Sequence, residues 1–202
     1  ERETDTMDTF FDSSWYFLRY TDPENKEIFA DEKKLKSWLP VNMYIGGAEH
    51  TVLHLLYSRF LTKFLYDQNY LNFKEPFLAL RHQGIILGPD GQKMSKSRGN
   101  VIDPDELVEK FGADSVRLHL CFMSEYNQGG PWNPTGILGV HRFLGRVWNL
   151  MGEKLKLKNQ KEEEKTNVVL EKILHKTIKK VGEDIEAFKF NTAVSALMIL
   201  VN

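Results

Sequence analysis

Two lysines, two serines and an arginine stand within six residues of the chain, at Lys93, Ser95, Lys96, Ser97 and Arg98. Ammonium groups on long stems can follow a charge that moves during a reaction, so this cluster suits a polyphosphate. An apolar run precedes it, and a Gly-Pro-Asp-Gly turn joins the two. An exposed basic turn would have the same composition. The pentapeptide Lys-Met-Ser-Lys-Ser, however, is expected at on the order of one position in a million from average residue usage, which favours a functional loop.

A double glycine follows a predicted strand in the first half of the chain. The apolar run 41–45 predicts a buried strand, and Gly46 and Gly47 come directly after it. A strand, two glycines and a helix allow the backbone to approach a nucleotide at the carboxyl edge of a sheet. Glu49 and His50 come next, where they can reach a ligand that lies over that edge. Two glycines alone are a weak signal, so a nucleotide site here is a hypothesis that other motifs have to support.

Two histidines four residues apart, His50 and His54, would share one face of a predicted helix and could in principle bind zinc together. The order is Glu-His-x-x-x-His instead of His-Glu-x-x-His, and no clear third ligand is near in sequence. The one cysteine, Cys121, lies in an apolar run where we expect a buried, unreactive thiol. We therefore expect no metal site, a polar His50 at the site, and a His54 that is packed or partly exposed.

The segment 10–20 is rich in aromatic residues, which is typical of a protein core. We predict a short strand over 7–11, followed by a helix that one of residues 12–14 caps. Ser13 and Tyr16 are three residues apart, so they would share a helical face beside the end of the strand. Such a face could line a pocket with an apolar wall and a few hydroxyl groups.

The remaining pattern predicts the elements that must position these residues. The first hundred residues or so alternate strand and helix, whereas the rest is helical, so we expect an α/β domain followed by an α-helical bundle. The apolar positions 53, 56, 60 and 64 form one stripe, as do 170, 174, 178 and 185, and each stripe should face a core. Expected helices are 32–39, 48–67, 105–111, 113–123, 137–155 and 168–188, with a last one capped by Asn191; 77–87 should be extended, 124–136 irregular, and 154–166 a solvated connection.

Composition fits a globular protein with a real core. The chain has 202 residues, 42% of them apolar, and a formal net charge of −1. From His141 onward there are twelve Lys/Arg and eight Asp/Glu residues, so this part carries a net charge of +4. That charge is compatible with RNA contact but is weak support for it. No apolar run has the length needed to span a membrane, so we expect no membrane partner.

With these motifs the chain resembles the leucine-specific branch, bacterial type, of the class I aminoacyl-tRNA synthetases. The pentapeptide at 93–97 is similar to the signature loop of the whole class, and the Asp-Thr-Phe…Ser-Ser-Trp-Tyr and Gly-Gly-x-Glu-His stretches point to the leucine branch. Between Arg81 and Lys93 the chain has only a short turn where many members of this branch carry a longer insertion. The segments that carry the resemblance are Glu3–Phe10, Asp12–Tyr16, Tyr44–His50, His54–Phe60 and Lys93–Asn100.

The resemblance implies a role for each of these groups. The chain would be the second half of a Rossmann-type catalytic domain, 1–102, then a connecting helical segment, 103–134, and the start of an anticodon-binding helical bundle, 135–202. The implied reaction joins leucine to tRNA(Leu) through a leucyl-adenylate, with ATP and Mg²⁺. The implied catalytic residues are Lys96, Lys93 and His50; the implied ATP contacts are Lys96, Lys93, Ser95, Ser97, Gly46, Gly47, Glu49 and Gln83; and the implied leucine pocket is Phe10, Ser13, Tyr16 and His50.

The resemblance also implies partners and leaves rivals open. We expect a piece of a longer cytoplasmic enzyme, inactive alone, whose partners include the N-terminal half and the editing domain of the same protein. A valine- or isoleucine-specific synthetase is a rival within the class. A non-catalytic RNA-binding relative is a rival of another kind, against which the intact lysine and serine loop and Glu49-His50 both argue, because binding alone does not need both.

Overall fold

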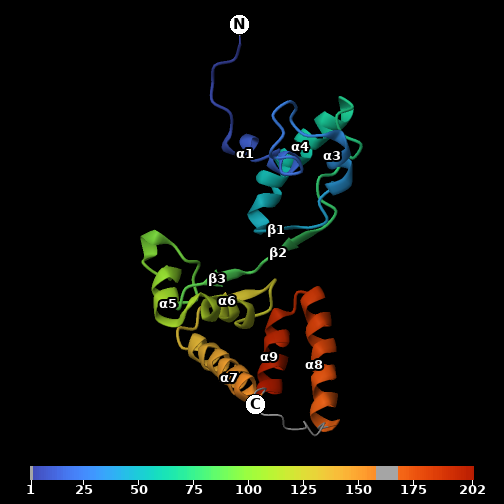
Figure 1. Ribbon diagram of the computed structural model, residues 1–202. Coiled ribbons are helices and arrows are strands. Elements are labelled where there is room, and N and C mark those ends of the chain that lie inside the picture. The colour runs from blue at the N-terminus through green and yellow to red at the C-terminus, as the bar shows by residue number, and fades with distance from the viewer. Residues whose placement is uncertain (1, 158–167) are drawn as a thin grey trace. The chain divides into compact units, whose positions relative to one another are not determined.

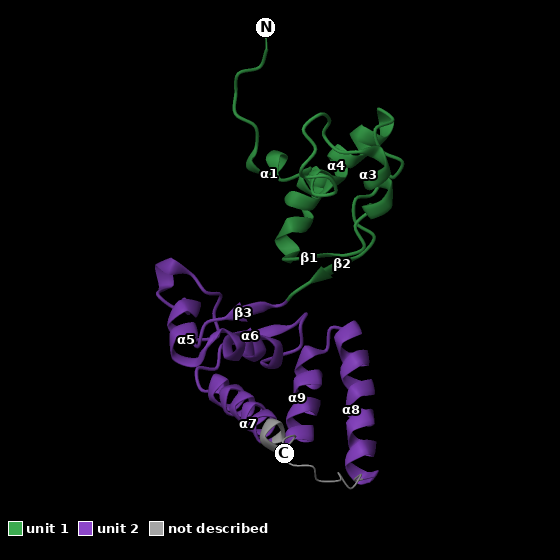
Figure 2. Cartoon of the chain, viewed as in Figure 1, with its two compact units in different colours: residues 1–83 green, residues 84–202 purple. Residues whose placement is uncertain are grey.

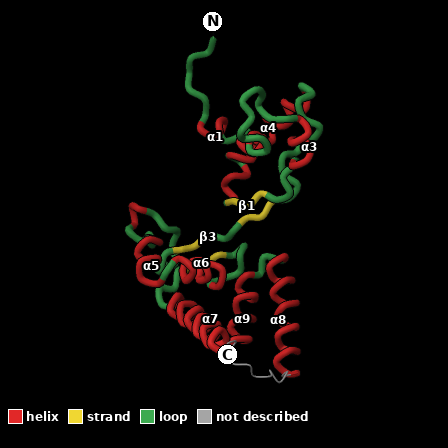
Figure 3. Tube along the Cα trace, in the orientation of Figure 1, coloured by secondary structure: helices red, strands yellow, loops and turns green. Residues whose placement is uncertain are grey.

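The computed structural model describes residues 2–157 and 168–202, in helices joined by loops and a few short strands (Figures 1 and 3). The chain divides into two compact units, 1–83 and 84–202 (Figure 2). The first unit holds the double glycine and the aromatic segment, and the second holds the lysine and serine loop. The functional segments expected at 1–102, 103–134 and 135–202 remain predictions.

The aromatic segment at the start of the first unit is helical, so the strand predicted over 7–11 is wrong. A single turn, α1, spans Thr9–Asp12, because the Asp8 carboxylate accepts a hydrogen bond from the Phe10 N–H. The next turn, α2, spans Tyr16–Arg19 and has no side-chain cap. The expected cap at 12–14 is also wrong, because the hydroxyls of Ser13 and Ser14 donate backward to carbonyls of α1.

A two-stranded parallel sheet carries the double glycine. Strand β1, Tyr44–Gly46, pairs with β2, Leu80–His82, so that Gly46 lies opposite His82. The prediction of a buried strand at 41–45 is wrong in part, since β1 has three residues and Ile45 is 54% exposed. The helix α3, Glu32–Trp38, confirms the helix expected at 32–39, and Asp31 caps it.

The helix predicted at 48–67 is broken into a 3₁₀ turn, Ala48–Thr51, and the helix α4, His54–Asp67. Its expected core stripe faces outward, with Phe60 70% exposed. The buried face carries small and polar side chains instead, because Ser58 and Thr62 allow close packing and the Thr62 hydroxyl donates to the Ser58 carbonyl. The core of this unit centres on Phe17, Leu18 and Leu39.

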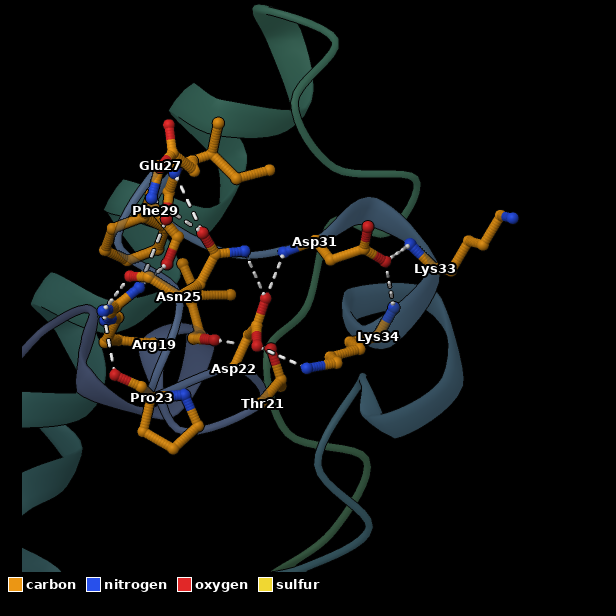
Figure 4. A network of polar contacts seen from close by, with 12 residues as sticks. Arg19, Thr21, Asp22, Pro23, Asn25, Glu27, Phe29, Asp31, Lys33 and Lys34 are labelled. Atoms are coloured by element: carbon orange, nitrogen blue, oxygen red, sulfur yellow. Dashed lines mark hydrogen bonds and ion pairs between the residues drawn. The ribbon is translucent and has the colours of Figure 1, made fainter.

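One arginine shapes the loop between α2 and α3 (Figure 4). The Arg19 guanidinium donates to four backbone carbonyls, those of Pro23, Asn25, Ile28 and Phe29. Asp22, whose side chain is buried, binds the Lys34 ammonium, the Asn25 amide and the Asp31 N–H. The hydrogen bond from Lys34, followed by that from Asn25, lowers the pKa of Asp22 to about 2.

This network predicts an acid-sensitive loop. The pKa of Asp22 is about 2 when folded and about 3.9 when unfolded, so its stabilising effect is complete above about pH 4 and is lost as the pH falls through about 2. We expect the Asp31 amide to exchange more slowly in the wild type than in Asp22→Asn at pH 5, with the difference shrinking as the pH falls and lost below about pH 2. Hydrogen exchange read by NMR or mass spectrometry measures this. A difference that does not change with pH would contradict the assigned role of the carboxylate.

The second unit begins with another two-stranded parallel sheet. Strand β3, Ile85–Leu87, pairs with β4, Gly129–Pro131. The extended segment predicted at 77–87 is therefore two strands in separate sheets, and the segment 124–136, expected to be irregular, supplies β4. The Trp132 indole follows β4, is buried, and packs edge-on against the buried His119 ring.

Within the described residues, the α-helices of this unit are α5, Pro104–Phe111; α6, Ala113–Phe122; α7, Gly136–Leu157; α8, Val168–Glu186; and α9, Phe190–Val201. The predicted helices are confirmed, but three details are wrong. The apolar stripe of α8 is exposed, while its Thr177 and Asp184 are buried, the latter accepting a hydrogen bond from Thr192 of α9. Helix α9 starts at Phe190, so Asn191 is not its cap. Cys121 is exposed because it lies on an outer face of α6.

Two further expectations, on the connection at 154–166 and on membrane-spanning helices, are compared with the described residues alone. The solvated connection predicted at 154–166 falls mostly on residues 158–167, which lie outside the described part. Among the helices of the described part, none is both long enough and apolar enough to cross a bilayer.

Candidate active site

The residues predicted to line an amino-acid pocket gather around the side chain of His54. The His54 Nε2 lies 2.8 Å from the carbonyl oxygen of Ser13 and 3.3 Å from the Ser58 hydroxyl, and its Nδ1 lies 3.2 Å from the Tyr44 hydroxyl. Its ring stacks on the rings of Tyr16 and Tyr44, at centroid distances of 5.7 and 5.5 Å. One buried imidazole therefore ties α4 to β1 and to the loop that carries Ser13.

The hydrogen-bond partners of His54 show which of its ring nitrogens donates. A carbonyl oxygen only accepts, so the Nε2 of His54 must carry the hydrogen that is donated to Ser13. In the neutral tautomer with this hydrogen on Nε2, the Nδ1 accepts from the Tyr44 hydroxyl. Both nitrogens are engaged, which leaves neither for a metal ion. Burial raises the pKa of Tyr44 and also that of Tyr16.

His50 links Phe10 to this group of rings. The His50 ring meets the Phe10 ring edge-on at 6.1 Å and the His54 ring edge-on at 6.3 Å. The Nδ1 of His50 is buried and has no hydrogen-bond partner within the described residues. An aromatic wall with one polar nitrogen free to bind a ligand is the kind of surface that holds a small apolar molecule with a polar end.

The carboxyl ends of β1 and β2 are tied together by side chains from β2 and just beyond it. The amide of Gln83, oriented by its partners, donates to the Gly46 carbonyl over 2.9 Å and accepts from the Gly47 N–H over 3.2 Å. His82 Nδ1 donates to the same Gly46 carbonyl over 3.0 Å. The predicted nucleotide contact Gln83 therefore holds the double glycine in place, and the Glu49 carboxylate folds back over Gly47.

The lysine and serine loop of the second unit has a defined shape. It leaves β3 through the turn at 88–91, bridges back from Lys93 to Leu87, and forms a short 3₁₀ turn, Lys96–Arg98. Lys93 and Lys96 have exposed side chains and take part in no ion pair within the described residues, so both ammonium groups can meet an anion. The hydroxyls of Ser95 and Ser97 are 2.8 Å apart.

A model of the family described as tRNA synthetases class I (I, L, M and V) matches residues 1–132. The chain belongs to this synthetase family. Its fold is accordingly the Rossmann-like fold of class I synthetases, with a helical C-terminal part. Two M. tuberculosis methionyl-tRNA synthetase structures share the fold at 18% and 19% identity, with TM-scores of 0.67 and 0.68; the chain covers 37% and 38% of them, and they cover 95% of it.

Relatives within the synthetase family are much more similar. The chain is 53% identical over its whole length to a leucine–tRNA ligase of Thermotoga petrophila and to one of Bdellovibrio bacteriovorus. It is 42% identical, with a TM-score of 0.87, to a LeuRS–tRNA–LeuAMS ternary complex from Agrobacterium radiobacter K84, which covers 100% of this chain. The chain spans about a quarter of the length of these relatives, 25% of each ligase and 27% of the LeuRS chain.

In this fold most of the predicted site residues fall into three groups: two in the first unit, and the lysine and serine loop in the second. Phe10, Tyr16 and His50 join Ser13 around His54, and Gly46, Gly47, Glu49 and Gln83 meet at one sheet edge. The central position of His54 could not be predicted, because two of its three hydrogen-bond partners, Ser13 and Tyr44, come from other segments of the chain; its histidine type was the only signal. A separate apolar cavity of about 690 Å³, between Trp15 and Tyr70, is lined by none of the four predicted pocket residues.

Proposed function

We propose that the full-length protein joins leucine to tRNA(Leu) with ATP, through a leucyl-adenylate. The observation that carries this proposal is 53% identity, over the whole chain, to leucine–tRNA ligases. The valine- and isoleucine-specific alternatives and the non-catalytic RNA-binding alternative are not favoured by these matches. Because the chain spans about a quarter of its relatives, the proposed activity is that of the longer enzyme, which we place in the cytoplasm.

The pocket residues have proposed roles that fit their surroundings. Phe10 and Tyr16 would give the leucine side chain an apolar wall, with Ser13 at its edge. The free Nδ1 of His50 would meet the polar end of the amino acid, close to the reacting carboxylate. Such a wall separates leucine from relatives that differ by one methylene by only about 1–3 kcal/mol, which supports an editing domain as a further part of the enzyme.

The proposed chemistry is attack of the leucine carboxylate on the α-phosphorus of ATP, with pyrophosphate leaving. Gly46, Gly47 and Glu49 would approach the ribose, and Gln83 would act by holding the two glycines. Lys93 and Lys96 would meet the charge that develops on the leaving pyrophosphate, where fixed cations stabilise the transition state most. Of the paired hydroxyls of Ser95 and Ser97, one donates to the other, so the second keeps its hydrogen for a phosphate oxygen.

Mg²⁺ would arrive with ATP as part of the substrate. Among the described residues no three His, Cys, Asp or Glu side chains form a metal-binding group, so we assign the ion no protein ligand. We propose tRNA(Leu) as the acceptor, which agrees with the net charge of +4 from His141 onward and with the tRNA in the Agrobacterium complex.

The N-terminal half of the enzyme is the proposed partner of the first unit. Parallel sheets are normally covered on both faces, yet the sheet formed by β1 and β2 has two strands, and Ile45 is exposed. The outward stripe of α4, which includes Leu56 and Phe60, is a second uncovered apolar surface. Both surfaces are suited to packing against further elements of the catalytic domain.

Pyrophosphate exchange into ATP tests the proposed function directly. The full-length parent enzyme is assayed with leucine, isoleucine and valine in parallel. We expect exchange that leucine stimulates far more than the other two do. Exchange with isoleucine or valine would reassign the amino acid, and no exchange with any of them, while tRNA still binds, would favour the non-catalytic relative.

His54 gives a prediction about leucine affinity. Replacing it by leucine in the parent enzyme leaves the partly buried Ser13 carbonyl and Tyr44 hydroxyl without their partner, at a cost of about 1–3 kcal/mol. We expect the KM for leucine in the exchange assay to rise by roughly 5- to 150-fold, with a much smaller change in the KM for ATP. His175→Leu, on an exposed part of α8, is the control. Equal changes in both KM values would contradict a role confined to the amino-acid pocket.

A further inference from the structure

The side chain of Asn100, just after the signature loop, uses both ends of its amide. Its Oδ1 accepts a hydrogen bond from the Ser95 N–H over 2.8 Å. Its Nδ2 lies 3.1 Å from each carboxylate oxygen of Asp90 and 3.4 Å from the Lys93 carbonyl. One side chain therefore contacts the turn before the loop, the first residue of the loop and its middle.

Asp90 is itself fixed within its turn. Its Oδ1 accepts a hydrogen bond of 3.0 Å from the Gln92 N–H, and the Gly88 N–H donates to the Gln92 carbonyl over 2.7 Å. These hydrogen bonds, first that from Gln92 and then that from Asn100, lower the pKa of Asp90. The carboxylate is thus an acceptor with a defined position, attached through its turn to β3.

A glycine in the left-handed conformation turns the backbone so that Asn100 can reach this carboxylate. Gly99 has φ of +66°, a conformation that a side chain would strain, and it ends the 3₁₀ turn Lys96–Arg98. The signature pentapeptide, 93–97, lies between Asp90 and Asn100 in the chain. Opening the contact between Asp90 and Asn100 would release that segment at both ends.

We propose that Asn100 and Asp90 form a clamp that holds the signature loop in the conformation in which Lys93 and Lys96 act. The proposal rests on the proposed function, since it assigns these two residues to positioning the lysines of that reaction. Neither is a catalytic residue, because each acts through the backbone of the loop. The contact needs a hydrogen-bond donor on one residue and an acceptor on the other. Substitutions can exchange these two roles between positions 90 and 100.

The reversal distinguishes a clamp from general damage. Asn100→Asp keeps an acceptor for the Ser95 N–H but places two carboxylates about 3 Å apart, so their repulsion should open the loop. Asp90→Asn alone keeps an acceptor for Gln92 and for Asn100, so its effect should be small. In the double variant an amide at position 90 can donate to a carboxylate at position 100, which restores the pair with the roles exchanged.

The test is leucine-dependent pyrophosphate exchange by the full-length enzyme. A misplacement of about 1 Å can cost on the order of 10²-fold in rate, so we expect Asn100→Asp to lower kcat by roughly 10- to 100-fold with the leucine KM unchanged. Asp90→Asn should lie within about threefold of wild type, and the double variant should recover at least tenfold over Asn100→Asp. Amide exchange at Ser95 should be faster in Asn100→Asp and slow again in the double variant.

Gln92→Ala is the matched control, because Gln92 takes part in the turn with its backbone N–H and carbonyl, which alanine keeps. An Asn100→Asp variant with wild-type kcat would overturn the proposal. So would a loss of kcat that Asp90→Asn does not relieve, since it would separate Asn100 from Asp90. Failure of the proposed function looks different: the wild-type enzyme itself would then show no exchange with leucine.

Discussion

Replacing Lys96 by alanine in the full-length enzyme is expected to lower leucine-dependent pyrophosphate exchange by about 10²–10³-fold, which corresponds to about 2.7–4 kcal/mol of transition-state stabilisation. The Lys96 ammonium is exposed and has no ion-pair partner in the described part of the chain, so the protein itself does not neutralise it. The Lys96 charge stabilises the transition state most as pyrophosphate leaves. The loss of activity in Lys96→Ala should therefore appear in kcat more than in the KM for ATP.

Two further variants sharpen the Lys96 experiment. Lys96→Arg keeps the charge but spreads it over a planar group, so partial activity is expected. Lys33→Ala removes an exposed lysine from the first turn of α3 and should leave exchange unchanged. If Lys96→Ala stays within about threefold of the wild type, the lysine has no part in the chemistry and the proposed reaction needs another cation.

A single methyl group at Gly129 is expected to separate the sheet from which the signature loop emerges. Gly129 has φ of +66°, and a Cβ there would lie 2.2 Å from the Ile85 carbonyl oxygen and 2.6 Å from the Ile85 nitrogen. Both clashes are with backbone, which cannot swing aside as a side chain can. Left-handed strain costs about 1–3 kcal/mol and overpacking about as much again, so Gly129→Ala should destabilise the pairing of β3 and β4 by roughly 2–6 kcal/mol.

The measurement for Gly129→Ala is local, because a protein of several domains has no single unfolding free energy. Amide exchange of the β3 and β4 backbone gives the opening free energy of this sheet. Gly139→Ala is the control: Gly139 lies inside α7 with open space around its Cα, so alanine should stabilise that helix by up to about 1 kcal/mol. Equal protection of β3 in the two variants would mean that the close backbone approach is not a constraint.

Helix content could be predicted from the sequence, but the buried face of a helix could not. A period of 3.6 residues identifies α4 and α8, yet in both helices the apolar stripe is exposed and polar residues such as Thr62 and Asp184 are buried. The periodic pattern shows that a helix has an apolar face to cover. It does not show whether these 202 residues supply the element that covers it. The strand expected over 7–11 failed for a local reason, because Asp8 caps a helical turn that bulky aromatic residues then fill.

A candidate site could be proposed from the sequence where it depends on short motifs. The double glycine with Glu49 and His50, and the lysine and serine loop, are contiguous in sequence, so their residue types and spacing were enough to propose chemistry. The roles of His54 and Asn100 could not be predicted from the sequence. His54 acts through hydrogen bonds to Ser13, Tyr44 and Ser58, and Asn100 acts through the orientation of its side-chain amide. Side-chain hydrogen bonds of this kind follow no fixed spacing in the sequence.

The arginine beneath the loop between α2 and α3 has a consequence for how that loop can evolve. Arg19 binds carbonyl oxygens, which every residue type provides, so the path of the loop is encoded largely by a residue outside it. The exposed side chains at Glu24, Lys26 and Glu27 can therefore change among descendants while the backbone keeps its course. The loop is a natural position at which to graft a foreign epitope or an affinity tag.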